Sequence, residues 1–280
     1  MKKFSILVAN YNNGTFFKTC YDSILSQKYP HFEVIILDDA STDNSLEVIR
    51  EMIGNDNRFK IFTNEQNSGV GITKARLIEL ASGEYCGFCD PDDALSPDAL
   101  QDAVDVFSKD ENTVLVYSNF YDCDEYLQPR NISKASKAVP SKDPYFFNCP
   151  IHMVHFVAFR KDIYETTSKM DTSKKIAEDQ DLYLKMYEKG KVQFIDKPNY
   201  YYRKHSGGIS QNENKQKSYE YWAEVIFNAM KRRGLTKING QKIPATFSNS
   251  QEIFDLLAYQ NKLPFRLKKK VKILIQNIFS

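Results

Sequence analysis

The sequence predicts an α/β fold in which a mostly parallel central sheet is flanked by helices. Over roughly the first 120 residues, short apolar runs alternate with segments of helical spacing, and the connections between them are short. Polar clusters follow three of these runs, as expected where parallel strands end at one edge of a sheet and bind ligands there. The chain has 280 residues, of which 42% are hydrophobic, so it can bury a sizeable core.

The apolar runs predict buried strands because their hydrophobic residues are continuous and each run is bounded by polar or turn residues. The first run stops at Asn10–Gly14, the second runs into Asp38-Asp39, and the fourth ends in Asp90–Asp93. In chain order, the expected strands are Phe4–Ala9, Phe32–Leu37, Phe59–Thr63, Glu84–Cys89 and Thr113–Ser118.

Helices are expected between these strands. In the segment 43–53, for example, Ile49 and Ile53 fall on one helical face, and Ser41 or Thr42 can cap the first turn. The expected helices of this part are 15–27, 43–53, 69–82 and one that begins at Pro97.

Beyond residue 120 the alternation of strands and helices is less regular. The segment Asn131–Lys142 is rich in Ser and Lys and predicts a mobile surface loop. The remaining expected elements are strands at His152–Phe159 and Val192–Ile195, and helices at Glu178–Glu188, 215–233 and 250–260. We therefore expect one domain over residues 1–210, followed by a small helical region over 211–280.

Composition and charge exclude several classes of protein. The net charge of +2 indicates no particular partner, and five cysteines, an odd number, argue against a secreted disulfide scaffold. The apolar run after Met1 is too short for a signal peptide, and no run approaches the roughly 18 apolar residues of a membrane span. A cytoplasmic protein is the expectation.

The turn Asp90-Pro-Asp92-Asp93 is the first candidate for chemistry. Carboxylates clustered on a turn repel one another, and a bound cation would relieve that repulsion. Mg²⁺ and Mn²⁺ take oxygen ligands and commonly share them with substrate phosphates. The same acids could serve only the turn and the start of the helix at Pro97. Their position at the end of a central strand favours the metal.

Two further acidic pairs lie on other elements. Asp38-Asp39 could accept hydrogen bonds from a base or a ribose. The alternative is that this polar region only caps the next helix, but Ser41, Thr42 or Asp43 could supply that cap without Asp38 and Asp39. The second pair, at 178–179, could remove the proton of an acceptor hydroxyl. Acids in the first turn of a helix are also common for electrostatic reasons, so this pair is ambiguous by itself.

The segment Tyr202–Ser210 combines cations with a flexible glycine pair. Arg203 and His205 could neutralise a diphosphate as it leaves, with the loop folded over it. A basic surface loop is an equally good explanation of this segment alone.

Several stretches of the sequence form an ordered set. They are Ser5–Asn12, Val34–Asp43, Asn67–Gly69 with Ala75-Arg76, Gly83–Tyr85, Asp90–Asp93, Glu178-Asp179 and the loop with Arg203 and His205. Any one of them is weak, but their order and spacing resemble the family 2 glycosyltransferases, which have the GT-A fold, invert the anomeric centre and carry a DxD signature. The resemblance covers about residues 1–210.

For the donor, the resemblance implies binding of a nucleoside-diphosphate sugar, with UDP favoured, by the half 1–118. Ala9, Tyr11 and Asp39 would hold the nucleoside, with Asp39 contacting the base. Arg76 would support the base or the diphosphate.

For the metal and the chemistry, the resemblance implies a Mn²⁺ or Mg²⁺ cofactor. Asp90 and Asp92 would be the DxD pair, with Asp90 facing the ribose and the metal and Asp92 ligating the metal. His205 would join them as a ligand and would meet the diphosphate together with Arg203. Asp179 would be the catalytic base.

For the acceptor, the resemblance implies transfer of a hexose or N-acetylhexosamine to a hydroxyl of a glycan or lipid-linked glycan, in polysaccharide or cell-envelope biosynthesis. The half 119–210 would bind this acceptor. The sequence departs from the family at Leu77, where Asn is common, and at Asn148–His155, where a small Gly-rich stretch is expected. His152 and His155 could face the acceptor or lie in an ordinary loop.

Two other classes of protein remain as alternatives. A sugar-nucleotide pyrophosphorylase would need a Gly-rich loop after the first strand, where Asn10–Gly14 has a single glycine. A sugar-nucleotide-binding protein without transferase activity would be favoured if Asp92 or Asp179 were missing, and both are present.

The last residues, 262–280, hold six basic residues and no acidic one. Their apolar side chains fall on one helical face. Such a helix can lie on an anionic membrane, at the inner membrane face, or can pack against the body of the protein with its lysines in water. Nucleic acid is not expected as a partner, because no basic patch is interleaved with aromatics elsewhere. The apolar residues are Leu263, Leu267, Val271, Leu274, Ile275 and Ile278.

Overall fold

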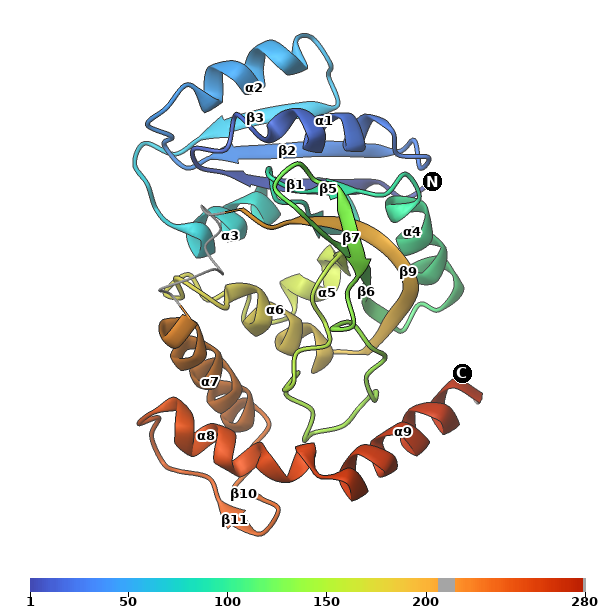
Figure 1. The fold of residues 1–280 in the computed structure, drawn as a ribbon, viewed down its shortest axis with the longest axis vertical. Coiled ribbons are helices and arrows are strands. Elements are labelled where there is room, and N and C mark those ends of the chain that lie inside the picture. The colour runs from blue at the N-terminus through green and yellow to red at the C-terminus, as the bar shows by residue number, and fades with distance from the viewer. Residues whose placement is uncertain (206–214, 279–280) are drawn as a thin grey trace.

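The computed structural model describes residues 1–205 and 215–278, and it confirms the expected α/β fold (Figure 1). The strands are β1 Phe4–Asn10, β2 Phe32–Asp38, β3 Phe59–Thr63, β4 Tyr85–Phe88, β5 Ala94–Leu95, β6 Thr113–Cys123, β7 Pro129–Ile132, β8 Val157–Arg160, β9 Lys191–Arg203, β10 Lys237–Ile238 and β11 Gln241–Lys242. The helices are α1 Phe17–Leu25, α2 Ser45–Ile53, α3 Val70–Leu80, α4 Ala99–Lys109, α5 Lys161–Glu165, α6 Glu178–Tyr187, α7 Lys215–Arg232, α8 Ser250–Leu257 and α9 Leu263–Ile278, with a 3₁₀ turn η2 at Ala258–Asn261.

The central sheet has its strands in the order β3-β2-β1-β4-β8-β6-β9-β5, with β7 beside β6. In the first part of the sheet, β1 pairs in parallel with β2 and β4, and β2 pairs in parallel with β3. Successive residues of β1 enter different cores: Ile6 packs with α1, α2 and α4, whereas Leu7 packs with α3, α6 and α7. Both faces of the sheet are therefore covered, which explains the continuous apolar runs.

The second part of the sheet is mixed rather than mostly parallel. β8 runs antiparallel to both β4 and β6, and β5 runs antiparallel to β9. β9, far longer than the expected Val192–Ile195, pairs in parallel with β6 and curves round the sheet (Figure 1). Strand direction could not be read from the sequence, because a buried apolar run has the same composition whichever way it points.

The segment 131–142 differs from the expected surface loop. Its first residues belong to β7, which pairs with β6. Ser136 and Val139 are buried, and the hydroxyl of Tyr117 donates a hydrogen bond to the carbonyl of Lys137 at 2.8 Å. The polar composition suggested a solvated loop, but part of the segment is buried and is hydrogen-bonded to the body of the protein.

The expected caps of α2 are also not observed. The residue before the helix is Asn44, and no side chain caps it. The hydroxyl of Ser41 instead accepts a hydrogen bond from the backbone N–H of Asn12 at 2.9 Å, which ties the loop after β1 to the loop after β2.

The C-terminal helices share a core with the sheet. Ile226 and Met230 of α7 and Leu257 of α8 are buried in the same cluster as Leu184 of α6. Figure 1 shows α7, α8 and α9 at the end of the molecule opposite α2. In the described parts of the chain, no helix combines the length and apolar character that crossing a bilayer requires.

Candidate active site

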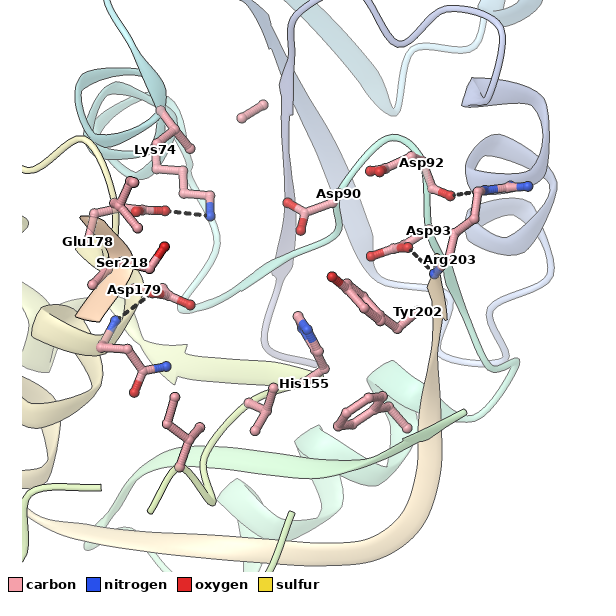
Figure 2. A pocket seen from close by; sticks show the side chains of 18 of the residues that line it. Lys74, Asp90, Asp92, Asp93, His155, Glu178, Asp179, Tyr202, Arg203 and Ser218 are labelled. Atoms are coloured by element: carbon pink, nitrogen blue, oxygen red, sulfur yellow. Dashed lines mark hydrogen bonds and ion pairs between the residues drawn. The ribbon is translucent and has the colours of Figure 1, made fainter. Parts of the chain in front are cut away.

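A cavity of about 610 Å³ opens beyond the carboxyl ends of β1 and β4, at the edge where the sequence placed its polar clusters. Its walls come from the loop after β4, from α3 and α6, from the end of β9 and from the start of α7 (Figure 2). The expected site residues that line it are Ala9, Asp90, Asp92, Asp179, Arg203 and His205.

The turn after β4 presents the acidic cluster to the cavity. The backbone N–H of Asp90 donates to the hydroxyl of Tyr200 at 3.1 Å, and the carboxylate of Asp93 accepts the backbone N–H of Arg203 at 2.7 Å. β9 therefore fixes the turn from behind. Burial and then the charge of Asp92 raise the pKa of Asp93 well above its usual range. Figure 2 shows Asp90 pointing toward the middle of the cavity.

The side chain of Arg203 is occupied by the protein itself. Its guanidinium donates to the backbone carbonyls of Asp92 and Glu125 and to the hydroxyl of Thr19, and it lies over the ring of Phe16. These bonds hold the acidic turn against α1 and the loop after β6. The role expected for Arg203 at the diphosphate thus remains a prediction, while its position supports the turn.

His205 is brought to the acidic turn as the resemblance implied. Its Nε2 lies 2.8 Å from a carboxylate oxygen of Asp92, and its ring contacts Phe16 with the centroids 4.7 Å apart. The rest of the expected basic loop, 206–210, lies outside the described residues.

The fit of the site to a divalent cation rests on this turn. Within residues 1–205 and 215–278, no three acidic, His or Cys side chains gather closely enough to hold a cation by themselves. Burial, and then the charge of Asp90, raises the pKa of Asp92, while the hydrogen bond with His205 opposes the rise. The turn and His205 could therefore supply only part of the coordination of a cation, with phosphate and water as further ligands, and the roles of Asp90, Asp92 and His205 as ligands remain predictions.

The opposite wall carries Asp179, at the start of α6 (Figure 2). One carboxylate oxygen accepts the backbone N–H of Gln180 at 2.7 Å. The pKa of Asp179 is raised to about 6, first by removal from water and then by the charge of Glu178, while Lys74 opposes the rise. A carboxylate with a pKa near 6 can accept a proton at neutral pH, as a general base must.

Two more side chains belong to the site: the sequence analysis missed one and left the other open. Lys74 of α3 forms a buried ion pair with Glu178 at 2.9 Å, next to Asp179. In the sequence it is an ordinary helical lysine, and no signal there marks it. His155, left open above, lines the cavity and stacks on Tyr200 and Tyr202 at centroid distances of 4.7 and 5.2 Å.

The two histidines of the unusual segment have different surroundings. Burial lowers the pKa of His155 to about 4, and that of His152 to about 4 as well. His155 is therefore a neutral ring in the cavity wall at neutral pH. His152 lies with Nδ1 3.1 Å from the carbonyl oxygen of Ala135, away from the cavity wall.

The residues expected to hold the nucleoside are only partly gathered. Ala9 lines the cavity, whereas Tyr11, Asp39 and Arg76 do not. The carboxylate of Asp39 accepts Asn64 Nδ2 at 2.6 Å and the N–H groups of Ser68 and Gly69 at 2.9 and 2.8 Å. It thus shapes the approach to α3 at the edge of the site.

Arg76 belongs to the same network. Its guanidinium donates to the side-chain oxygen of Asn64, which in turn donates to Asp39. The neighbouring Asp38 is used within the protein, since its carboxylate accepts Asn10 Nδ2 at 2.6 Å and both the N–H and the hydroxyl of Ser41. The contacts of Tyr11, Asp39 and Arg76 with a base remain predictions.

Comparison with curated proteins gives relatives that are much longer than this chain. The chain is 28% identical to a hyaluronan synthase of Pasteurella multocida over 98% of its own length and 27% of that protein. It is 31% identical to a chondroitin synthase of Escherichia coli over 69% of this chain and 28% of that protein. The chain thus spans about a quarter of the length of these relatives.

Comparison with solved structures supports the fold. TarS of S. aureus in complex with UDP-GlcNAc superposes with a TM-score of 0.69, covering 92% of this chain and 71% of TarS at 20% identity. The mannosyltransferase PcManGT of Pyrobaculum calidifontis, in complex with GDP-Man and Mn²⁺, has a TM-score of 0.59 at 17% identity, covering 99% of this chain and 87% of that one. These likenesses confirm the GT-A fold.

The sequence match to a family is broader than any single motif. A model described as "Glycosyl transferase family 2" matches residues 5–167, more than half of the chain. The match includes β1, the Asp38-Asp39 pair and the acidic turn after β4. Because this match covers more than half of the chain, the chain belongs to glycosyltransferase family 2.

Proposed function

We propose that the chain is an inverting glycosyltransferase that moves a sugar from a nucleoside-diphosphate donor to a hydroxyl of a glycan. The observation that carries this proposal is the placement of Asp179 in one cavity with the acidic pair Asp90 and Asp92, on the other side of it (Figure 2). One side suits a diphosphate with a cation, and the other suits removal of a proton.

The proposed step is a single displacement. The acceptor oxygen attacks the anomeric carbon, and its proton passes to Asp179. The bond between that carbon and the diphosphate oxygen breaks, and the electron pair leaves with the diphosphate. Bound Mn²⁺ or Mg²⁺ would act as a Lewis acid toward the leaving diphosphate. Asp90, Asp92 and His205 would hold it.

For the donor, we favour a UDP-sugar, and Mn²⁺ or Mg²⁺ as the cofactor. Support comes from TarS, whose structures include complexes with UDP-GlcNAc and with UDP, and from PcManGT with GDP-Man and Mn²⁺. For the acceptor, we favour a glycan, free or lipid-linked, in polysaccharide or cell-envelope biosynthesis. The similarity to hyaluronan and chondroitin synthases supports this choice.

We also propose that α9 rests on an anionic membrane surface, with the enzyme at the cytoplasmic face. The helix contacts the body through its polar side, where Lys272 pairs with Asp143 at 3.0 Å and Gln276 bonds the backbone of Ser141. Its apolar stripe faces outward, with Leu263 65% and Leu274 61% exposed.

The charges of α9 fit an anionic surface. Arg266, Lys268 and Lys270 are exposed on the helix that carries the stripe, and they form no ion pair within the described parts of the chain. An apolar stripe beside basic residues matches an interface of acyl chains and anionic headgroups. Each such cation near an anionic membrane contributes about 1 kcal/mol. The side chain of Ile278 lies outside the description.

Donor binding provides the first test of the transferase. Thermal unfolding would be followed with UDP, GDP, TDP and CDP, with and without Mn²⁺, for the wild type, Asp92→Ala and Asp179→Asn. A nucleotide at a hundred times its Kd should add about 2.7 kcal/mol to the free energy of unfolding. The metal-dependent part should be lost in Asp92→Ala and retained in Asp179→Asn.

The binding test identifies the nucleotide. Sugar transfer would then be measured with the corresponding nucleotide sugar, which distinguishes a transferase from a binding protein. Loss of the general base in Asp179→Asn should slow transfer about 10²–10⁴-fold while donor binding persists. Nucleotide binding without any turnover in the wild type would favour the sugar-nucleotide-binding protein. Absence of metal-dependent nucleotide binding would refute the transferase.

A further inference from the structure

The cavity extends past Asp179 to a wall formed largely by α7, which the family match does not cover. The first turns of α7 place Tyr219 and Trp222 on this wall, and residues 151 and 154 contribute apolar side chains near them. Figure 2 shows Ser218 of the same helix on the side of Glu178 and Asp179, away from Asp92. Since a donor diphosphate would occupy the side of Asp92, this wall faces the space left for the acceptor.

The wall is aromatic and is held rigidly from behind. Trp222 and Phe254 of α8 lie with their centroids 5.2 Å apart, and Tyr219 meets Phe254 edge to face at 5.9 Å. Tyr219 is nevertheless 41% exposed. Phe254 thus holds the rings of Tyr219 and Trp222, which line a polar cavity. Such rings bind the apolar face of a sugar more favourably than they bind water.

A polar feature of the same wall also lacks a partner. Trp222 Nε1 is shielded from water and has no hydrogen-bond acceptor in the described parts of the chain. An indole N–H is a donor only, and leaving it unpaired is unfavourable. Because this N–H is shielded, it is not itself open to a ligand, and the exposed aromatic surface is what the wall offers to a saccharide.

We propose that Tyr219 and Trp222 of α7 form the acceptor subsite and take a pyranose ring of the saccharide whose hydroxyl faces Asp179. This inference rests on the proposed transferase and adds a binding role for the C-terminal region. From the sequence, the helical region over 211–280 has no expected part in the site.

The chain offers a direct probe, because Trp222 is its single tryptophan. Wild-type protein saturated with the nucleotide that binds would be titrated with methyl β-glycosides of glucose, galactose, glucuronic acid and N-acetylglucosamine. At least one should change the tryptophan emission in a saturable manner. If the nucleotide binds but no saccharide changes the emission, the subsite is wrong while the transferase stands.

Variants test the same subsite by kinetics. Trp222→Ala and Tyr219→Ala should each raise the acceptor KM about tenfold, the loss expected for one aromatic contact, with donor KM unchanged. Trp222→Phe keeps a ring and should lie between them and the wild type. Tyr126→Ala removes a tyrosine that is exposed elsewhere and should have wild-type constants.

The same variants distinguish loss of the acceptor subsite from misfolding and from failure of the proposed function. Tyr219 is 41% exposed, so Tyr219→Ala should lower the Tm less than Trp222→Ala does. The proposal would be overturned if the acceptor KM were unchanged in Tyr219→Ala and Trp222→Phe. It would also be overturned if these variants lost donor affinity by as much as they lost acceptor affinity. A wild type that binds no nucleotide would instead refute the proposed function on which it rests.

Discussion

At the scale of single residues, the ionisation of Asp179, the proposed general base, depends on its burial and on two charges of opposite sign beside it. Burial raises the pKa of this carboxyl most, the charge of Glu178 raises it further, and Lys74 lowers it. The two are themselves paired at 2.9 Å. A buried ion pair next to the base is a means of setting the pH range in which the base is ionised.

This arrangement predicts the pH dependence of transfer. Asp179 has a pKa raised to about 6, and its protonated form cannot accept a proton. The kcat/KM should therefore fall about tenfold per pH unit below pH 6. Glu178→Gln removes a negative charge, lowers the pKa of Asp179 and should move the acid limb to lower pH. Lys74→Met should move it the other way, by roughly one unit.

The measurement is the pH profile of kcat/KM with the donor identified by binding. Lys74→Arg keeps the positive charge and serves as the matched control, with an acid limb close to that of the wild type. If both charge-removing variants retained the wild-type profile, Asp179 would not be the titrating base.

Asp179 could be predicted from the sequence because its acidic pair belongs to a recognisable ordered set. Lys74 could not be, because nothing local distinguishes it, and for His155 the sequence leaves both an acceptor-facing role and an ordinary loop position open. A lysine in an amphipathic helix is normally solvated, and a histidine after an irregular segment has no preferred partner. Their places beside the cavity depend on neighbours that are distant in sequence, 104 residues away in the case of Lys74 and Glu178.

At the scale of elements, the position of α3 depends on a glycine. A Cβ at Gly71 would lie 2.5 Å from the carbonyl oxygen of Lys174, in the segment that leads into α6. This close approach of α3 is what carries Lys74 to Glu178. The polar composition of the segment before α6 gave no indication of the contact.

We therefore expect Gly71→Ala to destabilise the protein. Alanine is favoured over glycine in a helix by about 1 kcal/mol, but overpacking against backbone costs about 1–3 kcal/mol. The free energy of unfolding in urea should fall, whereas helix propensity alone would raise it. Ile72→Ala, on the exposed side of the same turn, should change it by less than about 1 kcal/mol.

We expect the outward apolar stripe of α9 to bind vesicles that contain an anionic lipid. Leu267→Glu with Leu274→Glu places acids in the outward stripe and should abolish co-sedimentation with vesicles of phosphatidylcholine and phosphatidylglycerol. Wild-type binding should weaken in pure phosphatidylcholine and in high salt. Tyr126→Glu, an exposed site on another element, is the control. A stripe that binds no vesicle but forms dimers would indicate a second copy as its partner.

At the scale of the whole molecule, the division between residues 1–210 and 211–280 remains an expectation about function. The core does not follow it. Ala223 and Ile226 of α7 and Leu256 of α8 are buried together with residues of α6 and of the sheet. We infer that the C-terminal helices are part of one folding unit with the sheet.

Truncation tests this inference. A chain that ends at residue 210 would expose the apolar surface that α7 and α8 cover, so it should show no cooperative thermal unfolding. A chain that ends at residue 262 loses only α9, whose apolar stripe already faces outward, and should keep a Tm near that of the full chain. Cooperative unfolding of the shorter chain would show two independent units.

The sequence by itself determined which segments are strands and helices in the first half of the chain, and at which edge of the sheet the site lies. Continuous apolar runs and the polar residues that end them contain that information. Tertiary structure decided strand direction in the second half, the pairing of Lys74 with Glu178, the burial of His155, the place of Trp222 beside the cavity and the outward stripe of α9. Periodicity shows which face of an element is apolar, but only packing decides what covers that face and which charges meet.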